Sequence, residues 1–364
     1  MSKSSASSEP RNSARSALRV LAVTNAYPSP ERPTAGIFLA EQVEGLRRAG
    51  VAIEVVLFDR LKEGVRSYFG VGARLAEPIR TFDPDVIHVL YGGVLADRVA
   101  RTAADRPVVV TYHGSDLQGS ALAPLRVQLM AEYGVCCSRR AARHAAVIIF
   151  VARHLVRFLP EESRPKARVI PCGIDLERFR PLDRDACRKE LGWDNGRFQI
   201  LFATSNEDPI KRPDLARAAV EALRVRGIDA ELRILRGVPY ERVPAWLNAS
   251  DVLLLTSLTE GSPTIVKEAL ACNRPVVSVS VGDVAIQLEG VEGSFLADAT
   301  PEALAGALAR VAAGPRAIEG RSRARQYDNE ETALRLKDLY GEVLRSRQPH
   351  STPPPRLAVS GVDS

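Results

Sequence analysis

The chain has 364 residues, of which 45% are hydrophobic and 26% are charged. This balance is typical of a soluble globular protein, and the length predicts two domains rather than one core. No apolar run approaches the roughly 20 residues that cross a bilayer. Residues 1–16 are rich in serine and lack the apolar segment of a signal peptide. We therefore expect a cytoplasmic protein.

The net charge of +6 gives little reason to expect a nucleic-acid partner. Residues 1–16 and 347–364, both predicted to be disordered, carry three of these charges, which leaves +3 on the folded part. A weak peripheral attraction to the inner face of an anionic cell membrane stays open. The five cysteines lack a metal-binding spacing, and we expect reduced, mostly buried thiols.

Helices and strands alternate through the first half of the chain. A strand, an amphipathic helix closed by Gly50 and a second strand come first, and this order predicts a right-handed unit with parallel strands. The predicted strands are 18–23, 51–57, 86–90, 107–112, 146–151 and 168–171. The predicted helices are 37–48, about 71–81, 94–103 and 123–144, and a short one after residue 151.

The alternation restarts after a transitional segment at 172–193. The predicted strands are 199–203, 231–235, 251–255, 275–279 and one near 295. The predicted helices are 212–226, 240–248, 263–272, about 301–312, 315–326 and 330–345. Two such units in succession predict an α/β fold of two facing, doubly wound, Rossmann-like domains, with ligands at the carboxyl ends of the strands. His113, Glu260 and the loop after 199–203 follow strands directly, and Gly36 follows its strand across a longer loop.

A turn and a helix with the features of an anion site follow the strand at 251–255. Ser262 suits the position that caps the helix, and Pro263 suits the first helical position. We expect the free amides of residues 264–266 to point outward from the positive helix end, where a phosphate or diphosphate binds well. Glu260 and Glu268 bracket this site. Because carboxylates accept hydrogen bonds strongly, sugar hydroxyls are their natural ligands.

These residues resemble the family 4 glycosyltransferases of the GT-B fold, over about residues 18 to 345. The two glutamates form the E-x7-E pair within EGSPTIVKEALACNRPVVSVSVGDV, and supporting stretches are TAGIFLAEQVEGL, PDVIHVLY, VTYHGSDL, VIPCGIDLERFRP and KRPDLARAAVEAL. The chain is also similar to bacterial enzymes of cell-surface polysaccharide synthesis, such as those for teichuronic acid.

The resemblance implies an acceptor-binding domain at 17–175, a nucleotide-sugar-binding domain at 176–329 and a helix at 330–346 that crosses back onto the first domain. It implies a retaining transfer of a sugar from a nucleotide diphosphate donor to a hydroxyl of a sugar or lipid-linked glycan. We expect front-face attack by this hydroxyl and no metal or other cofactor.

The resemblance also assigns roles to the motif. Glu268 matches the glutamate that holds the ribose hydroxyls, with a solvated helix residue as the alternative. Glu260 matches the glutamate near the donor sugar, with an ordinary turn residue as the alternative. In the family, the backbone of the motif forms the cradle for sugar and diphosphate. The resemblance assigns this role here to Gly261, Ser262, Pro263, Thr264, Ile265 and Val266.

Lys211 matches the family lysine that neutralises the diphosphate. A cation placed in advance stabilises the charge that the leaving nucleotide gains. A solvated lysine is the alternative, although a helix N-terminus is a poor place for a structural cation. Many relatives carry an arginine about five residues earlier, where this chain has residues 205–207. Arg212, Arg236 or a neutral hydrogen bond from Asn206 are the candidate replacements.

His113 matches the family histidine near the transferred sugar, and a histidine that only ends a strand is the alternative. Asp116 could orient this histidine or cap the next helix. Gly36 matches the small residue that lets the N-terminal loop approach the donor phosphate without a Cβ clash. An ordinary glycine at a helix entry is equally consistent with the pattern.

Other signals are better read as structural. Asp83 and Asp85 spell D-x-D, but they form the turn that starts a strand, at the wrong end of the sheet for a ligand. His88 lies in mid-strand and is expected in the core. The arginine-rich helix with Arg139, Arg140 and Arg143 could contact acidic lipid, although a solvated face is the simpler interpretation.

Two other functions fit the same fold. A nucleotide-sugar 2-epimerase would convert the donor without any acceptor. A non-catalytic sugar-binding protein of this shape would normally carry an export signal, which we do not find in this sequence.

Overall fold

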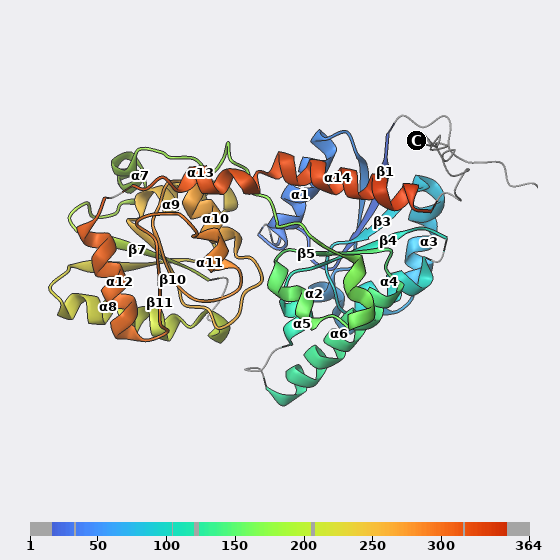
Figure 1. The fold of residues 1–364 in the computed structure, drawn as a ribbon, viewed down its shortest axis with the longest axis horizontal. Coiled ribbons are helices and arrows are strands. Elements are labelled where there is room, and N and C mark those ends of the chain that lie inside the picture. The colour runs from blue at the N-terminus through green and yellow to red at the C-terminus, as the bar shows by residue number, and fades with distance from the viewer. Residues whose placement is uncertain are drawn as a thin grey trace, which may run out of the picture.

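The computed structural model describes residues 17–32, 34–103, 105–119, 124–204, 208–315 and 317–347. It contains two sheets of parallel strands, in the orders β2-β1-β3-β4-β5-β6 and β11-β10-β9-β7-β8. Figure 1 shows each sheet with its helices as a separate body. The prediction of two doubly wound α/β domains is confirmed. Of the ends predicted to be disordered, residues 1–16 and 348–364 lie outside the described residues.

The N-terminal domain follows the predicted alternation closely. Its strands are β1 (Arg19–Thr24), β2 (Ala52–Leu57), β3 (Val86–Val89), β4 (Val108–Tyr112), β5 (Val147–Phe150) and β6 (Ala167–Val169). Its helices are α1 (Ile37–Arg48), α2 (Arg60–Glu63), α3 (Val71–Phe82), α4 (Val94–Thr102), α5 (Ser115–Gln118) and α6 (Leu125–His144).

The second domain repeats this architecture. Its strands are β7 (Phe198–Ala203), β8 (Ala230–Leu235), β9 (Val252–Leu255), β10 (Val276–Val279) and β11 (Phe295–Ala297). Its helices are α7 (Arg184–Leu191), α8 (Pro213–Val225), α9 (Val243–Ala249), α10 (Thr264–Ala271), α11 (Val284–Gln287), α12 (Pro301–Ala313) and α13 (Gly320–Ala324). The final helix is α14 (Asn329–Arg345).

Three predicted helices were wrong in length or type. The helix expected at 315–326 is only α13 followed by a 3₁₀ turn at Arg325–Tyr327, because Gly314, Pro315 and Gly320 do not favour a continuous helix. The helix expected at 240–248 begins as a 3₁₀ turn at Tyr240–Arg242. The short helix expected after residue 151 is a pair of 3₁₀ turns, Arg153–Phe158 and Glu161–Lys166.

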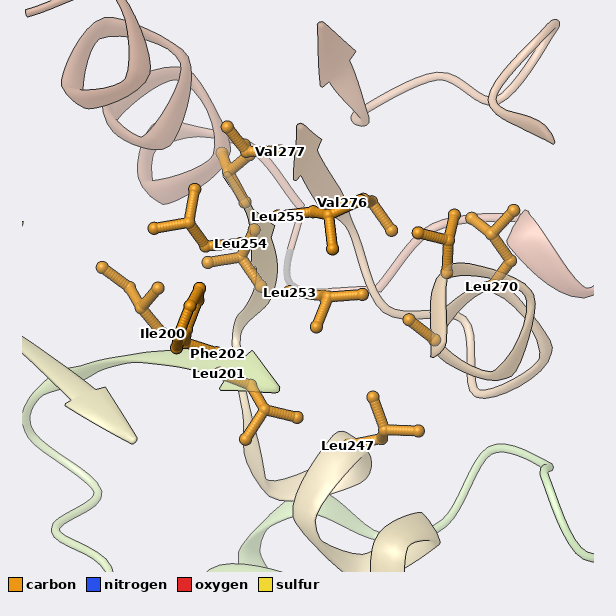
Figure 2. Packing of buried hydrophobic residues seen from close by; sticks show 14 of the residues in the cluster. Ile200, Leu201, Phe202, Leu247, Leu253, Leu254, Leu255, Leu270, Val276 and Val277 are labelled. Atoms are coloured by element: carbon orange, nitrogen blue, oxygen red, sulfur yellow. The ribbon is translucent and has the colours of Figure 1, made fainter. Parts of the chain in front are cut away.

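The core of the C-terminal domain lies between its sheet and helices. Figure 2 shows apolar side chains of β7, β9 and β10 gathered together, with Leu270 of α10 and Leu247 of α9 beside them. Strands β9 and β10 are buried along their whole length, as a parallel sheet covered on both faces requires. The packing holds α10 in place directly after the strand that leads to the predicted donor site.

Helix α14 packs onto the N-terminal domain, beside α1 (Figure 1). Its buried side chains, Ala333, Leu336, Leu339, Tyr340 and Val343, join one apolar cluster with β1 and α1. This is the crossing helix of the predicted fold class, which the structure confirms.

His88 and Tyr340 join α14 to the N-terminal sheet by a buried hydrogen bond of 2.7 Å between Nδ1 and the hydroxyl. The other ring nitrogen of His88 lies 2.7 Å from Oγ1 of Thr111. Burial lowers the pKa of His88 to about 3, so the ring is neutral. The prediction of a core histidine is confirmed.

Asp83 and Asp85 have structural roles at the amino ends of the strands. Asp83 ends α3 in a left-handed conformation and forms an ion pair with Arg106. The carboxylate of Asp85 accepts a hydrogen bond of 2.9 Å from the Arg19 amide, at the start of β1. They therefore lie at the opposite end of the sheet from His113, as expected.

Two further observations concern the whole described chain. All five cysteines are free thiols, and Cys136 alone is exposed, which confirms the expectation of mostly buried cysteines. Among the described residues, no helix is both long and apolar enough to span a membrane.

Replacing Tyr340 with Phe should destabilise the N-terminal domain by about 1–3 kcal/mol, because buried Nδ1 of His88 would lose its partner. Urea unfolding followed by circular dichroism measures this change. Both tryptophans of the chain, Trp193 and Trp246, lie in the other domain, so their fluorescence should respond less. Tyr133→Phe, at an exposed position of α6, is the control, and an equal loss in both variants would contradict the role of Tyr340.

Candidate functional site

Lys211 and Glu260 form an ion pair at the carboxyl ends of two adjacent strands. Nζ of Lys211 lies 2.5 Å from Oε1 of Glu260, and both side chains are mostly buried. Lys211 follows β7 and Glu260 follows β9, and these strands pair directly. Strand order reverses at β7, which pairs with both β8 and β9, and such a reversal is where doubly wound sheets bind ligands. The structure thus brings two predicted site residues into contact.

Two hydroxyls after β9 hold this pair in place. Thr256 donates from Oγ1 to the carbonyls of Lys211, at 2.7 Å, and Arg212, at 3.0 Å. Ser257 donates from Oγ to Oε1 of Glu260, at 2.7 Å. Sequence reasoning missed both residues, although two adjacent hydroxyl residues directly after a buried strand were a usable signal.

The prediction that Ser262 caps α10 was wrong. The helix begins at Thr264 after Pro263, without a side-chain cap. Ser262 Oγ instead donates to the buried carboxylate of Asp283 at 2.9 Å and accepts from Nε2 of Gln287 at 3.3 Å, so partners other than the helix amides occupy the hydroxyl.

The amide of Val266 is not free either, since it donates to the carbonyl of Pro263 at 3.3 Å. This turn bond corrects the prediction of three free amides. The first-turn amides of Thr264 and Ile265 are those that a helix leaves without an intrahelical partner, and they retain the geometry of an anion site.

Glu268 is buried within α10, which excludes a solvated surface residue. Burial raises the pKa of its carboxyl to about 7. The hydroxyl of Tyr240 donates to its Oε1 at 3.2 Å. Tyr240 itself lies beneath the Arg178 guanidinium and against the edge of Phe179. The carboxyl of Glu268 is therefore an acceptor whose charge changes near neutral pH.

Lys267, the neighbour of Glu268, is a completely buried cation that sequence reasoning missed. Its ammonium donates to the carbonyl of Cys172 at 3.0 Å and lies 4.7 Å from the ring centre of Tyr327. Burial lowers the pKa of this ammonium. Cys172 belongs to the segment that leaves the first domain, so Lys267 ties α10 to the junction between domains.

His113 is held by aromatic neighbours at the end of β4. Its ring stacks on Tyr91 with centres 5.1 Å apart and meets Phe38 edge-on at 5.0 Å. Its Nε2 donates to the Leu90 carbonyl at 2.9 Å, which leaves Nδ1 as the acceptor, 3.8 Å from Sγ of Cys172. Burial lowers the pKa of His113 to about 4, so the imidazole is neutral.

Asp116 positions the backbone rather than the imidazole. Its carboxylate accepts from the amides of His113 at 3.1 Å, Gly114 at 2.9 Å and Gly92 at 3.0 Å. Burial raises its pKa to about 6 in spite of these donors. Asp116 therefore neither orients the His113 imidazole nor caps the next helix, which were the two predicted roles. It shapes the loop that carries His113.

The two domains touch where the His113 loop meets the motif. A Cβ added to Gly261 would lie 1.8 Å from the carbonyl oxygen of His113, and one added to Gly114 would lie 3.2 Å from Cα of Gly261. Only glycine permits this approach, because no side chain fits between the two backbones. The contact places Glu260 and His113 on opposite sides of one seam.

Gly36 has a local structural reason to be glycine. Its backbone is left-handed, with φ of 64°, and a Cβ would lie 2.6 Å from the carbonyl oxygen of Ala26. The structure thus explains this glycine by the loop after β1, and contact with a donor phosphate stays a prediction. Asn206 and its neighbours Ser205 and Glu207 lie outside the described residues.

The described residues contain no cluster of three His, Cys, Asp or Glu side chains arranged to hold a metal ion. The site does contain the ion pair of Lys211 and Glu260 and the N-terminus of α10. It also contains the carboxyl of Glu268, whose pKa is about 7. Such a set can bind an anion beside hydroxyl groups.

Family models match both halves of the chain. Residues 14–178 match the model described as Glycosyltransferase Family 4, and residues 192–313 match the one described as Glycosyl transferases group 1.

Similar proteins span almost the whole chain. TuaC of Bacillus subtilis, assigned to teichuronic acid biosynthesis as a glycosyltransferase, is 26% identical over 80% of this chain and 89% of its own length. The sucrose-phosphate synthase structure of Thermosynechococcus elongatus has a TM-score of 0.72 at 16% identity, over 90% of this chain and 100% of that one. Anabaena HepE in complex with UDP-glucose has a TM-score of 0.61 at 16% identity, over 89% and 100%.

The two solved structures have the same fold as this chain. The family models and TuaC show the relationship in sequence. The resemblance to the family 4 glycosyltransferases is thereby confirmed. This chain belongs to the family 4 glycosyltransferases and is a glycosyltransferase enzyme.

Proposed function

We propose that this enzyme is a retaining glycosyltransferase that moves a sugar from a nucleotide diphosphate donor to an acceptor hydroxyl in bacterial cell-surface polysaccharide or glycoconjugate synthesis. The observation that carries the proposal is the Lys211–Glu260 pair at the strand-order reversal, beside the N-terminus of α10. The complex of HepE with UDP-glucose supports the donor class, and the assignment of TuaC to teichuronic acid biosynthesis supports the pathway.

The donor diphosphate would lie between Lys211 and the amides of Thr264 and Ile265. In the structure Glu260 neutralises the Lys211 ammonium, so the donor would have to share or replace this partner. A diphosphate that takes over the ammonium would free the Glu260 carboxylate for hydroxyls of the sugar. Binding of the diphosphate and binding of the sugar are therefore linked through the ion pair of Lys211 and Glu260.

The reaction breaks the bond between the sugar C1 and the diphosphate oxygen and forms a bond from C1 to the acceptor oxygen. Charge develops on the departing diphosphate, where Lys211 and the helix end would stabilise it. The acceptor attacks from the face that the diphosphate leaves, so its proton can pass to the departing oxygen. No step requires a metal, and the absence of a metal requirement stays a prediction.

Glu260→Gln and Lys211→Ala should each lower transfer about 10²–10³-fold, because each removes a charge that acts on the donor. Release of nucleoside diphosphate from a panel of nucleotide sugars, with and without a chelator, measures this. A thermal-shift screen of the same panel identifies the base and sugar, since a ligand at about 100 times its Kd stabilises the fold by about 2.7 kcal/mol.

Asp83→Asn is the matched control for these variants, because Asp83 pairs with Arg106 at the far end of the sheet. It should retain nearly all activity. Loss of activity in Asp83→Asn together with inhibition by the chelator would contradict the metal-free mechanism.

Gly261→Ala should strongly reduce transfer while each domain stays folded. Its Cβ would overlap the His113 carbonyl, so the two domains could not meet at the seam. We expect a loss of about 10²-fold or more in transfer, as misplacement of reacting groups causes, with an unchanged circular dichroism spectrum. Gly134→Ala, on α6 with open space around it, is the control. Full activity in Gly261→Ala would contradict a closed seam.

Donor affinity should fall about tenfold from pH 8 to pH 6, because the pKa of Glu268 near 7 makes its carboxylate the minor form at the lower pH. The ionised carboxylate is the form that accepts bonds from two ribose hydroxyls. Titration with an intact nucleotide sugar at several pH values measures this. Glu268→Gln should bind weakly with little pH dependence, and an unchanged pH profile in this variant would contradict the ribose contact.

A further inference from the structure

The first half of α6 carries several exposed apolar side chains. Leu125, Leu129 and Tyr133 are 70%, 63% and 52% exposed, and Val127 and Met130 are exposed almost as much. The buried residues of this helix begin only at position 135. Figure 1 shows the first half projecting beyond the neighbouring helices. Single exposed apolar residues are ordinary, but a contiguous group of them marks an interaction surface.

The exposed apolar residues form a continuous stripe. Leu125, Leu129, Tyr133 and Cys136 are spaced by four, four and three residues, which aligns them along one helix face. The face points away from the N-terminal domain, since the buried positions of α6 lie on the opposite side. An ordinary surface helix shows the reverse pattern, with its apolar stripe turned inward.

The charge on α6 is strongly positive. Four arginines, Arg126, Arg139, Arg140 and Arg143, stand against a single acid, Glu132. Arg140 pairs with buried Asp97, and Arg143 pairs with exposed Glu162. Arg139 and Arg126 are exposed. The helix therefore presents apolar side chains at its projecting end, with exposed Arg126 among them and exposed Arg139 just beyond Cys136.

We propose that this outer face of α6 is a docking surface for a lipid bilayer that contains anionic lipids. The apolar stripe would enter the boundary between headgroups and acyl chains, while exposed Arg126 and Arg139 bind headgroup phosphates. Charge favours this occupant over a second copy of the chain, because a symmetric dimer through α6 would bring two arginine-rich helices together.

Docking through α6 would also orient the active site. Ser138 of α6 donates to the carbonyl of Asp116 at 2.7 Å and accepts from the amide of Gly93 at 2.8 Å. Tyr112, the neighbour of His113, donates its hydroxyl to the Ser138 carbonyl at 2.6 Å. The helix is thus fixed to the loop that carries His113. This places a lipid-linked acceptor within reach, a consequence that rests on the proposed function, whereas the docking itself does not.

Vesicle binding tests the docking directly. Cys136 is the single exposed cysteine and lies in the stripe, so a polarity-sensitive dye can be attached there. We expect a blue shift and co-sedimentation with vesicles of phosphatidylcholine and phosphatidylglycerol, both reduced by salt. Pure phosphatidylcholine vesicles should bind much less. No shift, or equal binding to both vesicles, would overturn the proposal.

Two exposed leucines give a matched pair of variants. Leu129→Glu should weaken binding of the unlabelled protein to the anionic vesicles about tenfold or more. The change removes an apolar side chain that would enter the bilayer and adds a negative charge. Leu334→Glu changes a leucine of α14 that is 51% exposed and should leave vesicle binding unchanged. Equal losses in the two variants would overturn the proposal. So would a dimer in analytical ultracentrifugation that Leu129→Glu dissociates.

The two proposals can fail separately. Nucleotide-sugar binding in a thermal shift should be the same in Leu129→Glu as in the unchanged protein, because α6 lies outside the donor site. Lost vesicle binding with intact donor binding supports the docking surface. Absent vesicle binding with intact donor binding in the unchanged protein refutes the docking surface and leaves the proposed transfer standing.

Discussion

The site depends on a buried cation that holds α10 against the junction of the two domains. Lys267 of α10 reaches the Cys172 carbonyl on the outgoing segment and the Tyr327 ring on the returning one. These two segments also bind each other, since the Ile174 amide donates to the Tyr327 carbonyl at 2.8 Å. A buried charge is costly unless it is paired or hydrogen-bonded, so the ammonium is stable only while all three elements stay together. Alignment of α10 with the N-terminal domain follows from that requirement.

Close backbone packing then sets where the two halves of the site meet. Gly261 and Gly114 let the motif and the His113 loop approach without intervening side chains. The Asp116 carboxylate gathers the amides of that loop, and aromatic rings fix the orientation of the His113 imidazole. Neutral His113 adds no charge to the seam. In the C-terminal domain, Lys211 and Glu260 compensate each other as an ion pair.

Much of this arrangement could be predicted from residue patterns. Apolar runs such as Val252–Leu255 and amphipathic runs such as Ile37–Arg48 have strand and helix periods, and their alternation implies parallel sheets. The E-x7-E motif directed attention to Glu260 and Glu268. The patterns failed where a distant partner decided the outcome. Ser262 is a residue type that often caps a helix, but its hydroxyl donates to Asp283, which follows the next strand. Residue patterns also left a solvated Glu268 open as the alternative, whereas the structure buries its side chain and pairs its carboxyl with the Tyr240 hydroxyl.

The sequence by itself determined the two α/β domains, the order of their elements, the family and the main candidate residues, because these depend on local periodicity and on a contiguous motif. Only the tertiary structure decided that Lys211 and Glu260 are ion-paired, that Lys267 bonds to the domain junction and that the apolar face of α6 points outward. Each of these facts joins residues that are far apart in the chain or depends on which face of a helix its neighbours cover. Such relations arise from packing, which a local pattern does not contain.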